Sequence, residues 1–195
     1  FYKMPEALNY VRPYYHLKVA DAEINEMKNF INQIPEDKYR HNQLSYEDEN
    51  RDIYVEKYRS CEILAPDQDS VFFRVGRKIF HYINSKHYEY DLSDKFEFQI
   101  LKYRPGGHYE WHIDYGSCFF YGLDRKLSMS IQLSDENEYD GGELEIKGTG
   151  DSVTTAGKAL GSVIVFDSKV THRAKPVIKG ERIVMVGWAA GPKLR

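Results

Sequence analysis

The sequence predicts an α+β fold that is mainly β, with helices first and a β-sandwich or barrel after them. Hydrophobic residues recur at helical spacing before about residue 95. After that point, short alternating or apolar segments follow one another closely, separated by turns that contain Gly and Pro. The 16 Tyr and 10 Phe residues also suit β-structure. A length of 195 residues is enough for one domain and short for two.

The first 95 residues predict one strand and two helices. Residues 14–19 form a candidate strand, and a helix begins near Asp21, a candidate N-cap, and ends before Pro35. Residues 36–52 are polar and indicate a loop, and Asp69 is a candidate cap for the second helix. The apolar faces of the two helices contain Ile24, Met27, Ile31 and Ile34 in the first, and Phe72, Val75, Ile79 and Ile83 in the second.

The second half of the chain predicts strands and tight turns. Residues 95–104 form a candidate strand that ends at a turn with the sequence RPGGH. Residues 126–134 alternate, with Leu127, Met129, Ile131 and Leu133 on one face and Ser128, Ser130 and Gln132 on the other. After the turn in YDGGELEI, a short apolar strand at 161–167 and a last strand at 182–190 complete the pattern.

Composition and charge exclude several classes of protein. No apolar run approaches the roughly 20 residues of a membrane-spanning helix. The net charge of −3 makes a protein built mainly to bind nucleic acid an unfavoured interpretation. The start of the chain shows no signal peptide, so a cytoplasmic, intracellular protein is the default expectation. The two cysteines, Cys61 and Cys118, are expected to be reduced thiols.

Three features of the second half of the chain indicate a metal-binding or anion-binding site. His112 and Asp114 are two residues apart, so in a strand both side chains lie on one face, although a surface His–Asp pair fits equally well. His172 follows a short apolar strand; two His and one carboxylate can hold an octahedral metal with three open positions, whereas a lone loop His is the plainer interpretation. Arg182 shares a strand face with Val184, Val186 and Trp188, where it either meets an anion or reaches solvent from an edge strand.

Together these features resemble a known family in order and spacing. Residues 96–190, through YRPGGHYEWHID, LSMSIQLSDENEYDGGELEI, GSVIVFDSKVTH and KPVIKGERIVMVGW, resemble the Fe(II)- and 2-oxoglutarate-dependent dioxygenases, in the prolyl 4-hydroxylase-like branch with its PKHD-type hydroxylases. The resemblance implies a double-stranded β-helix, also called a jelly roll and cupin-like, as the core at 96–195 with the iron site. We expect residues 1–195 to form a single domain, with the helical or mixed part at 1–95 packed on one sheet of that core.

The resemblance also implies roles for individual residues. His112, Asp114 and His172 match the metal ligands and catalytic centre, and Arg182 matches the base that binds the distal carboxylate of 2-oxoglutarate. Tyr103 matches a Tyr on the cofactor side of the pocket. Three further residues are expected to bind the cofactor: Gln132, which stands where relatives often have a Tyr, together with Ser130 and Trp188 by strand alternation.

The activity implied is hydroxylation of an amino-acid residue, most of all proline in a peptide or protein, with release of succinate and CO2. Fe(II), 2-oxoglutarate and O2 would take part, and ascorbate would support activity. Two alternatives stay open: hydroxylation of a free amino acid or other small metabolite, and a non-catalytic binding module on the same fold. Nucleic-acid demethylases carry a second Arg six residues after the first, a position occupied here by Trp188. Lys169, Arg173, Lys175 and Lys179 are mainly expected to form a solvated loop, although they could attract an acidic substrate.

Overall fold

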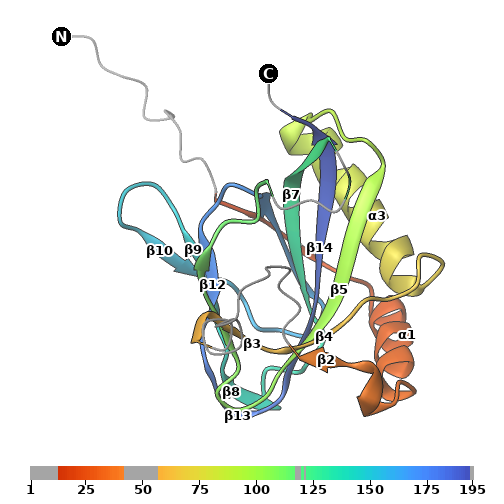
Figure 1. Ribbon diagram of the computed structural model, residues 1–195, viewed down its shortest axis with the longest axis vertical. Coiled ribbons are helices and arrows are strands. Elements are labelled where there is room, and N and C mark those ends of the chain that lie inside the picture. The colour runs from red at the N-terminus through yellow and green to blue at the C-terminus, as the bar shows by residue number, and fades with distance from the viewer. Residues whose placement is uncertain (1–12, 42–56, 117–119, 121, 194–195) are drawn as a thin grey trace, which may run out of the picture.

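Two β-sheets face each other, and two helices cover the outer face of the larger sheet (Figure 1). The computed structural model describes residues 13–41, 57–116, 120 and 122–193. The facing sheets form the jelly-roll core that the second half of the sequence predicts, with the helices packed on one sheet as expected.

The larger sheet has seven strands and the smaller has five, with a two-stranded ribbon beside them. In spatial order the larger sheet contains β1 (Tyr15–Lys18), β11 (Ser162–Asp167), β7 (Leu123–Gln132), β14 (Arg182–Pro192), β5 (Lys95–Tyr103), β4 (Glu62–Leu64) and β2 (Arg40–His41). The smaller sheet contains β10 (Val153–Thr155), β9 (Leu144–Lys147), β12 (His172–Ala174), β6 (His108–His112) and β3 (Arg59–Ser60). The ribbon pairs β13 (Val177–Gly180) with β8 (Tyr139–Gly141).

Strand alternation gives the larger sheet two different faces. On β7, Leu127, Met129 and Ile131 belong to the core under the helices. The intervening Ser128 and Ser130 point toward the smaller sheet, and β14 repeats the pattern in register, because Trp188 pairs with Ser128 and Val186 with Ser130. One face of the sheet therefore stabilises the fold while the other presents the side chains that line an internal cavity.

The helices α1 (Asp21–Asn32) and α3 (Val71–Ile83) pack their predicted apolar faces on this sheet. Both N-caps lie one residue from the predicted positions: Ala20 and Ser70 occupy them in place of Asp21 and Asp69, and neither makes a side-chain capping bond. Asp21 instead lies in the first turn of α1, where its carboxylate faces the positive end of the helix dipole.

The polar segment between the helices contains more structure than the expected loop. A 3-10 turn, η1 (Glu36–Lys38), and the edge strand β2 form within it, because Arg40 and His41 pair with β4. A π-helical turn, η2 (Asn84–Tyr88), follows α3. Residues 42–52 of the predicted loop and Cys118 lie outside the described residues, and Cys61 is buried.

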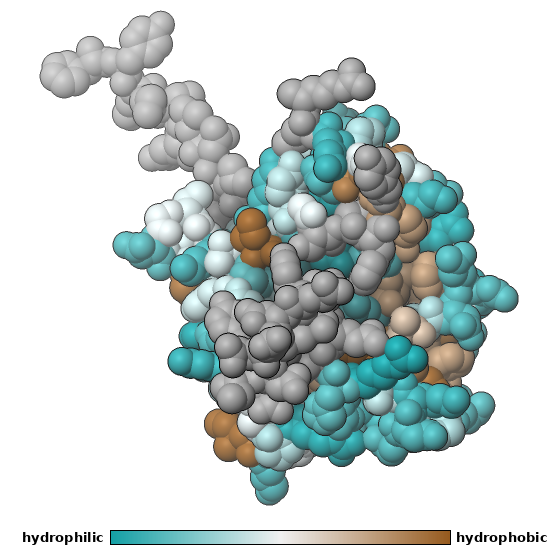
Figure 2. Space-filling view, in the orientation of Figure 1, coloured by the Kyte–Doolittle hydropathy of each residue, from teal (hydrophilic) through white to brown (hydrophobic). Residues whose placement is uncertain are grey.

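The described helices and the surface shown in Figure 2 can be compared with what a membrane-spanning helix requires. No helix among the described residues is long and apolar enough to cross a membrane. On the face in Figure 2 the described residues are mostly hydrophilic, and hydrophobic residues lie in separate small groups.

Two glycines allow α3 to approach the larger sheet closely. A Cβ added at Gly76 of α3 or at Gly187 of β14 would lie 2.3 Å from a ring atom of Phe98. Phe98 is itself buried on β5 and meets Phe73 and Phe80 of α3 edge-on and stacked. The absence of a side chain at these two positions therefore determines how tightly the helix packs.

We expect Gly187→Ala to destabilise the protein, because the new methyl group overlaps the Phe98 ring in a closely packed core. The expected cost is about 1–3 kcal/mol in the free energy of unfolding, measured by denaturant or thermal melting. Gly157→Ala is the control, because its added Cβ meets Ser162 Oγ at an ordinary 3.7 Å. Equal stability of the two variants would contradict this account of the helix contact.

Candidate metal centre and active site

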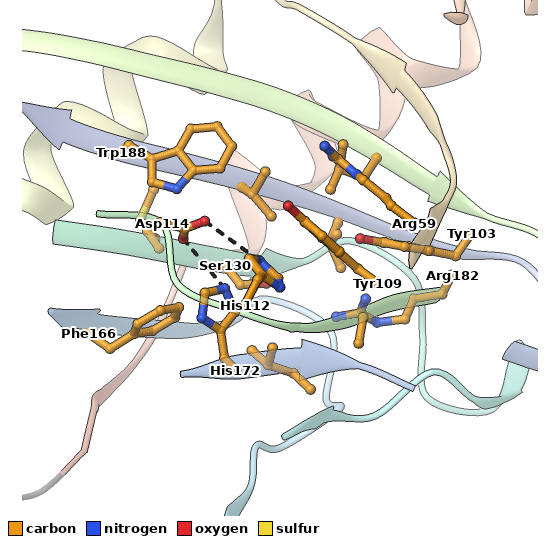
Figure 3. A pocket seen from close by; sticks show the side chains of 16 residues that line it. Arg59, Tyr103, Tyr109, His112, Asp114, Ser130, Phe166, His172, Arg182 and Trp188 are labelled. Atoms are coloured by element: carbon orange, nitrogen blue, oxygen red, sulfur yellow. Dashed lines mark ion pairs between the residues drawn. The ribbon is translucent and has the colours of Figure 1, made fainter. Parts of the chain in front are cut away.

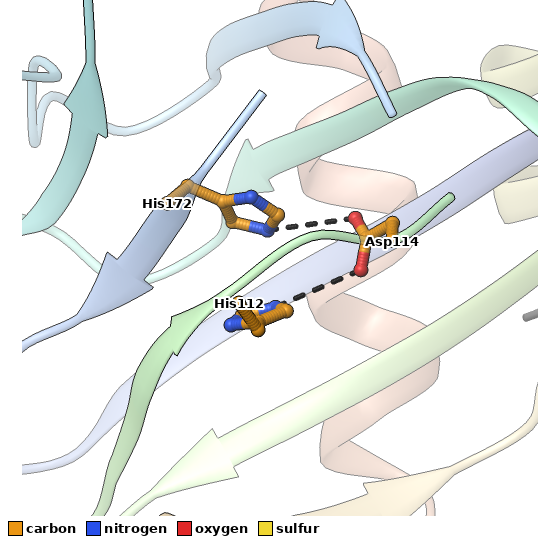
Figure 4. A group of neighbouring side chains, drawn as sticks. All are labelled: His112, Asp114 and His172. Carbon is orange, nitrogen blue, oxygen red and sulfur yellow. Dashed lines mark ion pairs between the residues drawn. The ribbon is translucent and has the colours of Figure 1, made fainter. Parts of the chain in front are cut away.

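Three metal-binding side chains converge between the two sheets (Figure 4). His112 ends β6, Asp114 follows it by two residues, and His172 begins the neighbouring strand β12. The strands pair with His172 directly opposite His112, so residues 60 positions apart in sequence become neighbours. One ligand atom from each of the three residues lies within 4.8 Å of the others. The Nε2 atoms of His112 and His172 lie 3.6 and 3.4 Å from the oxygens of Asp114.

Backbone carbonyls set the orientation of both imidazole rings. His112 Nδ1 lies 2.7 Å from the carbonyl oxygen of Glu110, and His172 Nδ1 lies 2.9 Å from that of Val170. A carbonyl oxygen can only accept a hydrogen bond, so Nδ1 carries the proton in each ring. The Nε2 lone pairs are therefore left to face the common centre, as in other histidine ligands whose second nitrogen is held by the protein.

Asp114 is held by groups from the larger sheet. Ser128 Oγ donates to Asp114 Oδ2 at 2.8 Å, and the indole N–H of Trp188 donates to the same carboxylate. The backbone N–H of Asp114 donates to the carbonyl oxygen of Ser168 at 2.9 Å. These bonds fix a buried carboxylate whose position in the chain, outside a regular strand, would otherwise leave it mobile.

The electrostatics of the cluster favour the protonation states that a metal requires. Burial, followed by the neighbouring His172, lowers the pKa of His112 to about 3, so its ring is neutral. Burial alone would raise the pKa of Asp114, but His172, His112 and the bonds from Trp188 and Ser128 hold that pKa below its ordinary value. A neutral imidazole and an ionised carboxylate are the forms that bind a divalent cation.

The donor set fits Fe(II). Two imidazole nitrogens and one carboxylate oxygen on one side of a centre leave the other positions open, which is the pattern of non-haem Fe(II) oxygenases. A closed structural zinc site would need a fourth protein ligand, and no fourth His, Cys, Asp or Glu joins the group among the described residues.

Arg182 faces the same cavity from the first position of β14 (Figure 3). The side chain is only 4% exposed, and its guanidinium carbon lies 5.4 Å from the ring centre of Tyr103, its partner on β5. A Cβ at Gly142 would lie 2.9 Å from Arg182 Cδ, so the second glycine of the GGEL turn gives room for the arginine stem. No carboxylate pairs with Arg182 within the described part of the chain, so an anion is the natural occupant beside it.

The other sequence-predicted residues divide into two groups. Tyr103, Ser130 and Trp188 line the cavity together with the metal cluster and Arg182. Gln132 is not part of that wall: its amide donates to the hydroxyl of Tyr139 at 2.8 Å, and Arg182 bonds to the same hydroxyl. The geometry therefore places Gln132 behind Arg182, in contact with it through Tyr139 rather than directly at the cavity.

Several cavity residues carry no clear signal in the sequence. Tyr109 stacks on His112 with ring centres 3.5 Å apart, and Arg59 reaches the cavity from β3, 53 positions before His112. Tyr109 belongs to an aromatic-rich stretch, but no sequence pattern distinguishes Arg59 on β3, or Tyr139 on β8 beside Arg182, from the residues around them. Their placement depends on strand pairing across the smaller sheet and the ribbon.

Two of the four basic residues near His172, which are Lys169, Arg173, Lys175 and Lys179, form ion pairs with glutamates of β9 and its preceding turn. Arg173 bonds to Glu145 at 2.7 Å, and Lys175 lies within 3.9 Å of both Glu143 and Glu145. These two side chains therefore cover the outer side of the β9–β12 pair, and the idea that the whole group attracts an acidic substrate is weakened.

Comparisons with known sequences support one family. Residues 98–190 match the sequence model of the 2OG-Fe(II) oxygenase superfamily. A PKHD-type hydroxylase of Maricaulis maris is 38% identical over 89 residues, which are 46% of this chain and 39% of that protein. A PKHD-type hydroxylase of Gloeothece citriformis is 40% identical over 87 residues, 45% of this chain and 39% of that protein. The chain thus covers about two fifths of the length of these curated relatives.

Solved structures agree on the fold. A prolyl-4-hydroxylase of Pseudomonas putida superposes with a TM-score of 0.72 at 17% identity, covering 93% of this chain and 94% of that one. A prolyl hydroxylase of Trichoplax adhaerens, in complex with a hypoxia inducible factor peptide fragment, also gives 0.72, at 15% identity over 92% and 84% of the two chains. Identities this low show the double-stranded β-helix alone. Residues 98–190 are thus similar in sequence to the 2OG-Fe(II) oxygenase superfamily, and among the curated proteins to PKHD-type hydroxylases.

Proposed function

We propose that the protein is an Fe(II)- and 2-oxoglutarate-dependent dioxygenase that hydroxylates an amino-acid residue, with proline in a peptide or protein as the leading substrate. In this reaction one oxygen atom of O2 enters a substrate C–H bond as hydroxyl. The other enters 2-oxoglutarate, which is converted to succinate and CO2. Ascorbate would keep the iron reduced between turnovers.

One observation carries the proposal: three metal ligands and an unpaired buried arginine face one cavity (Figure 3). Iron with three protein ligands can accept a bidentate co-substrate and O2 together. Arg182 supplies a planar pair of donors suited to a carboxylate. A zinc hydrolase would leave Arg182 without a role, and a binding module would not need the intact ligand set.

Each residue of the candidate site has a separate role in the proposed reaction. His112, Asp114 and His172 would hold Fe(II), which would activate O2 for its reaction with 2-oxoglutarate. Ser128 and Trp188 hold the Asp114 carboxylate in place through their hydrogen bonds. Arg182 would bind the distal carboxylate of 2-oxoglutarate, with Tyr103 beside it. The cavity wall contributed by Val184, Val186 and Leu101 excludes water around these charged groups.

The substrate class rests on relatives. The sequence relatives are named PKHD-type hydroxylases, and two solved structures of the same fold are named prolyl hydroxylases, one of them holding a peptide. The decisive test is succinate release with Fe(II), ascorbate and 2-oxoglutarate across proline-containing peptides and free proline, with mass spectrometry to detect one added oxygen atom. Stimulation of succinate release without an oxidised substrate would contradict a hydroxylase.

We expect His112→Ala and His172→Ala to lower 2-oxoglutarate turnover at least about 100-fold, because each removes a direct ligand, a larger change than the loss of an outer hydrogen bond. Iron binding, followed by calorimetry under anaerobic conditions, should weaken in parallel. His81→Ala is the matched control, since His81 is about half exposed on α3 and far from the cavity in the fold. Turnover near that of the parent protein in either ligand variant would overturn the metal assignment.

We expect Arg182→Gln to act mainly on 2-oxoglutarate. Loss of a buried charged hydrogen-bond pair should cost about 2–5 kcal/mol, seen as a KM for 2-oxoglutarate raised about 30-fold or more while kcat changes less. Arg77→Gln is the control, because Arg77 pairs with Asp94 on the exposed side of α3. An unchanged KM in Arg182→Gln would place the carboxylate elsewhere.

A further inference from the structure

A second buried arginine faces the metal cavity. Arg59 on β3 is 5% exposed and lines the same cavity as Arg182 and the metal ligands (Figure 3). Its Nε donates to Cys61 Sγ at 3.2 Å, and its guanidinium carbon lies 4.7 Å from the ring centre of Tyr109. Tyr109 in turn stacks on the proposed ligand His112. The cation therefore lies one aromatic ring away from the metal cluster.

Two other buried basic residues, Lys102 and Arg125, have carboxylate partners. Lys102 Nζ bonds to Glu36 at 2.8 Å, and Arg125 Nε bonds to Glu97 at 3.0 Å. Arg59 forms no ion pair with any described Asp or Glu. Arg182 and Lys126, whose Nζ is buried without a hydrogen-bond partner, also lack one, but of these three residues only Arg59 and Arg182 line the metal cavity. An unpaired charge is costly to bury, so such a group points to an anion that arrives with a ligand.

Neutral neighbours do not compensate the charge of Arg59. Its hydrogen-bond partner is the Cys61 thiol, and burial raises the pKa of that thiol, so it is not an anion near neutral pH. With Fe(II) and 2-oxoglutarate bound, Asp114 and the two carboxylates of the co-substrate would still leave one positive charge of the cavity unmatched. A neutral prolyl residue would not supply the missing negative charge.

We propose that Arg59 binds a carboxylate of the substrate, so that the enzyme acts on a free amino acid or on the carboxyl-terminal residue of a peptide. This inference rests on the proposed function and deepens it by naming the substrate class. The carboxylate would lie against the guanidinium fork beside Tyr109, which places the carbon atoms attached to it next to His112. An internal prolyl residue, flanked by neutral amides, would leave Arg59 unpaired.

The first experiment needs no substrate. Arg59→Met and Arg125→Met are compared by thermal melting of the full chain, since both remove a buried guanidinium. We expect Arg59→Met to leave Tm unchanged or raise it, because the variant removes an uncompensated charge that is retained for binding. Arg125→Met should lower Tm, because it removes the guanidinium that bonds to the buried carboxylate of Glu97. A loss of Tm, or a failure to fold, in Arg59→Met comparable to that in Arg125→Met would assign Arg59 a structural role and overturn the proposal.

The second experiment compares acids with their amides. Anaerobic calorimetry of the iron-loaded protein with 2-oxoglutarate uses L-proline against L-prolinamide, and Ala-Ala-Pro with a free carboxyl end against its carboxamide. We expect the acid of at least one pair to bind about tenfold or more tightly than its amide. That preference should vanish in Arg59→Gln, recover in part in Arg59→Lys and persist in Arg77→Gln. Absence of any acid preference in the parent protein would overturn the proposal.

A titration with 2-oxoglutarate tests whether Arg59 binds a carboxylate of the substrate or one of the co-substrate. Arg59→Gln should bind 2-oxoglutarate within about threefold of the parent protein, whereas Arg182→Gln should not. If both variants weaken co-substrate binding equally, Arg59 holds the co-substrate and the substrate assignment falls. Failure of the proposed function would look different: the parent protein would then release no succinate from 2-oxoglutarate, whatever the behaviour of the Arg59 variants.

Discussion

The buried carboxylate of Asp114 is the interaction on which the active site depends. It lies beyond the end of β6 in the smaller sheet, yet the groups that hold it, Ser128 and Trp188, come from β7 and β14 of the larger sheet. Its two oxygens face the Nε2 atoms of His112 and His172. A single side chain thus links the two layers of the fold and faces the position a metal would take, so the site forms only when both sheets are in place.

The alternation of the central strands makes that link compatible with a stable core. On β7 and β14, every second residue packs under the helices, where Phe98 fits between Gly76 and Gly187. The residues in between face the smaller sheet: Ser130 and Trp188 line the cavity, and Ser128 bonds to Asp114. Apolar burial on one face stabilises the sheet, so the other face can bear polar groups whose hydrogen bonds are satisfied across the cavity.

Buried charge separates structural from functional residues in this protein. The Arg125–Glu97 pair is satisfied within the chain, and Arg125 also lies 3.8 Å from the ring centre of Trp188. Arg59 and Arg182 have the same burial but no carboxylate among the described residues. Because the chain does not compensate these two charges, we propose that ligands do, the co-substrate at Arg182 and the substrate at Arg59.

Local patterns in the sequence were enough to predict the mainly β fold, the two helices and a common face for His112 and Asp114. The convergence of His172 with these two residues was predicted from the resemblance to a known family. Helical spacing, strand alternation and the two-residue spacing of His112 and Asp114 act over a few residues and need no knowledge of the partner strand. Each helix cap was displaced by one residue, because packing on the sheet outweighs a single capping bond. The positions of Arg59, Tyr139 and Gln132 came from the tertiary structure alone. β3 pairs with β6 and β8 with β13 over long sequence separations, and such pairings depend on the assembled sheets rather than on any local pattern.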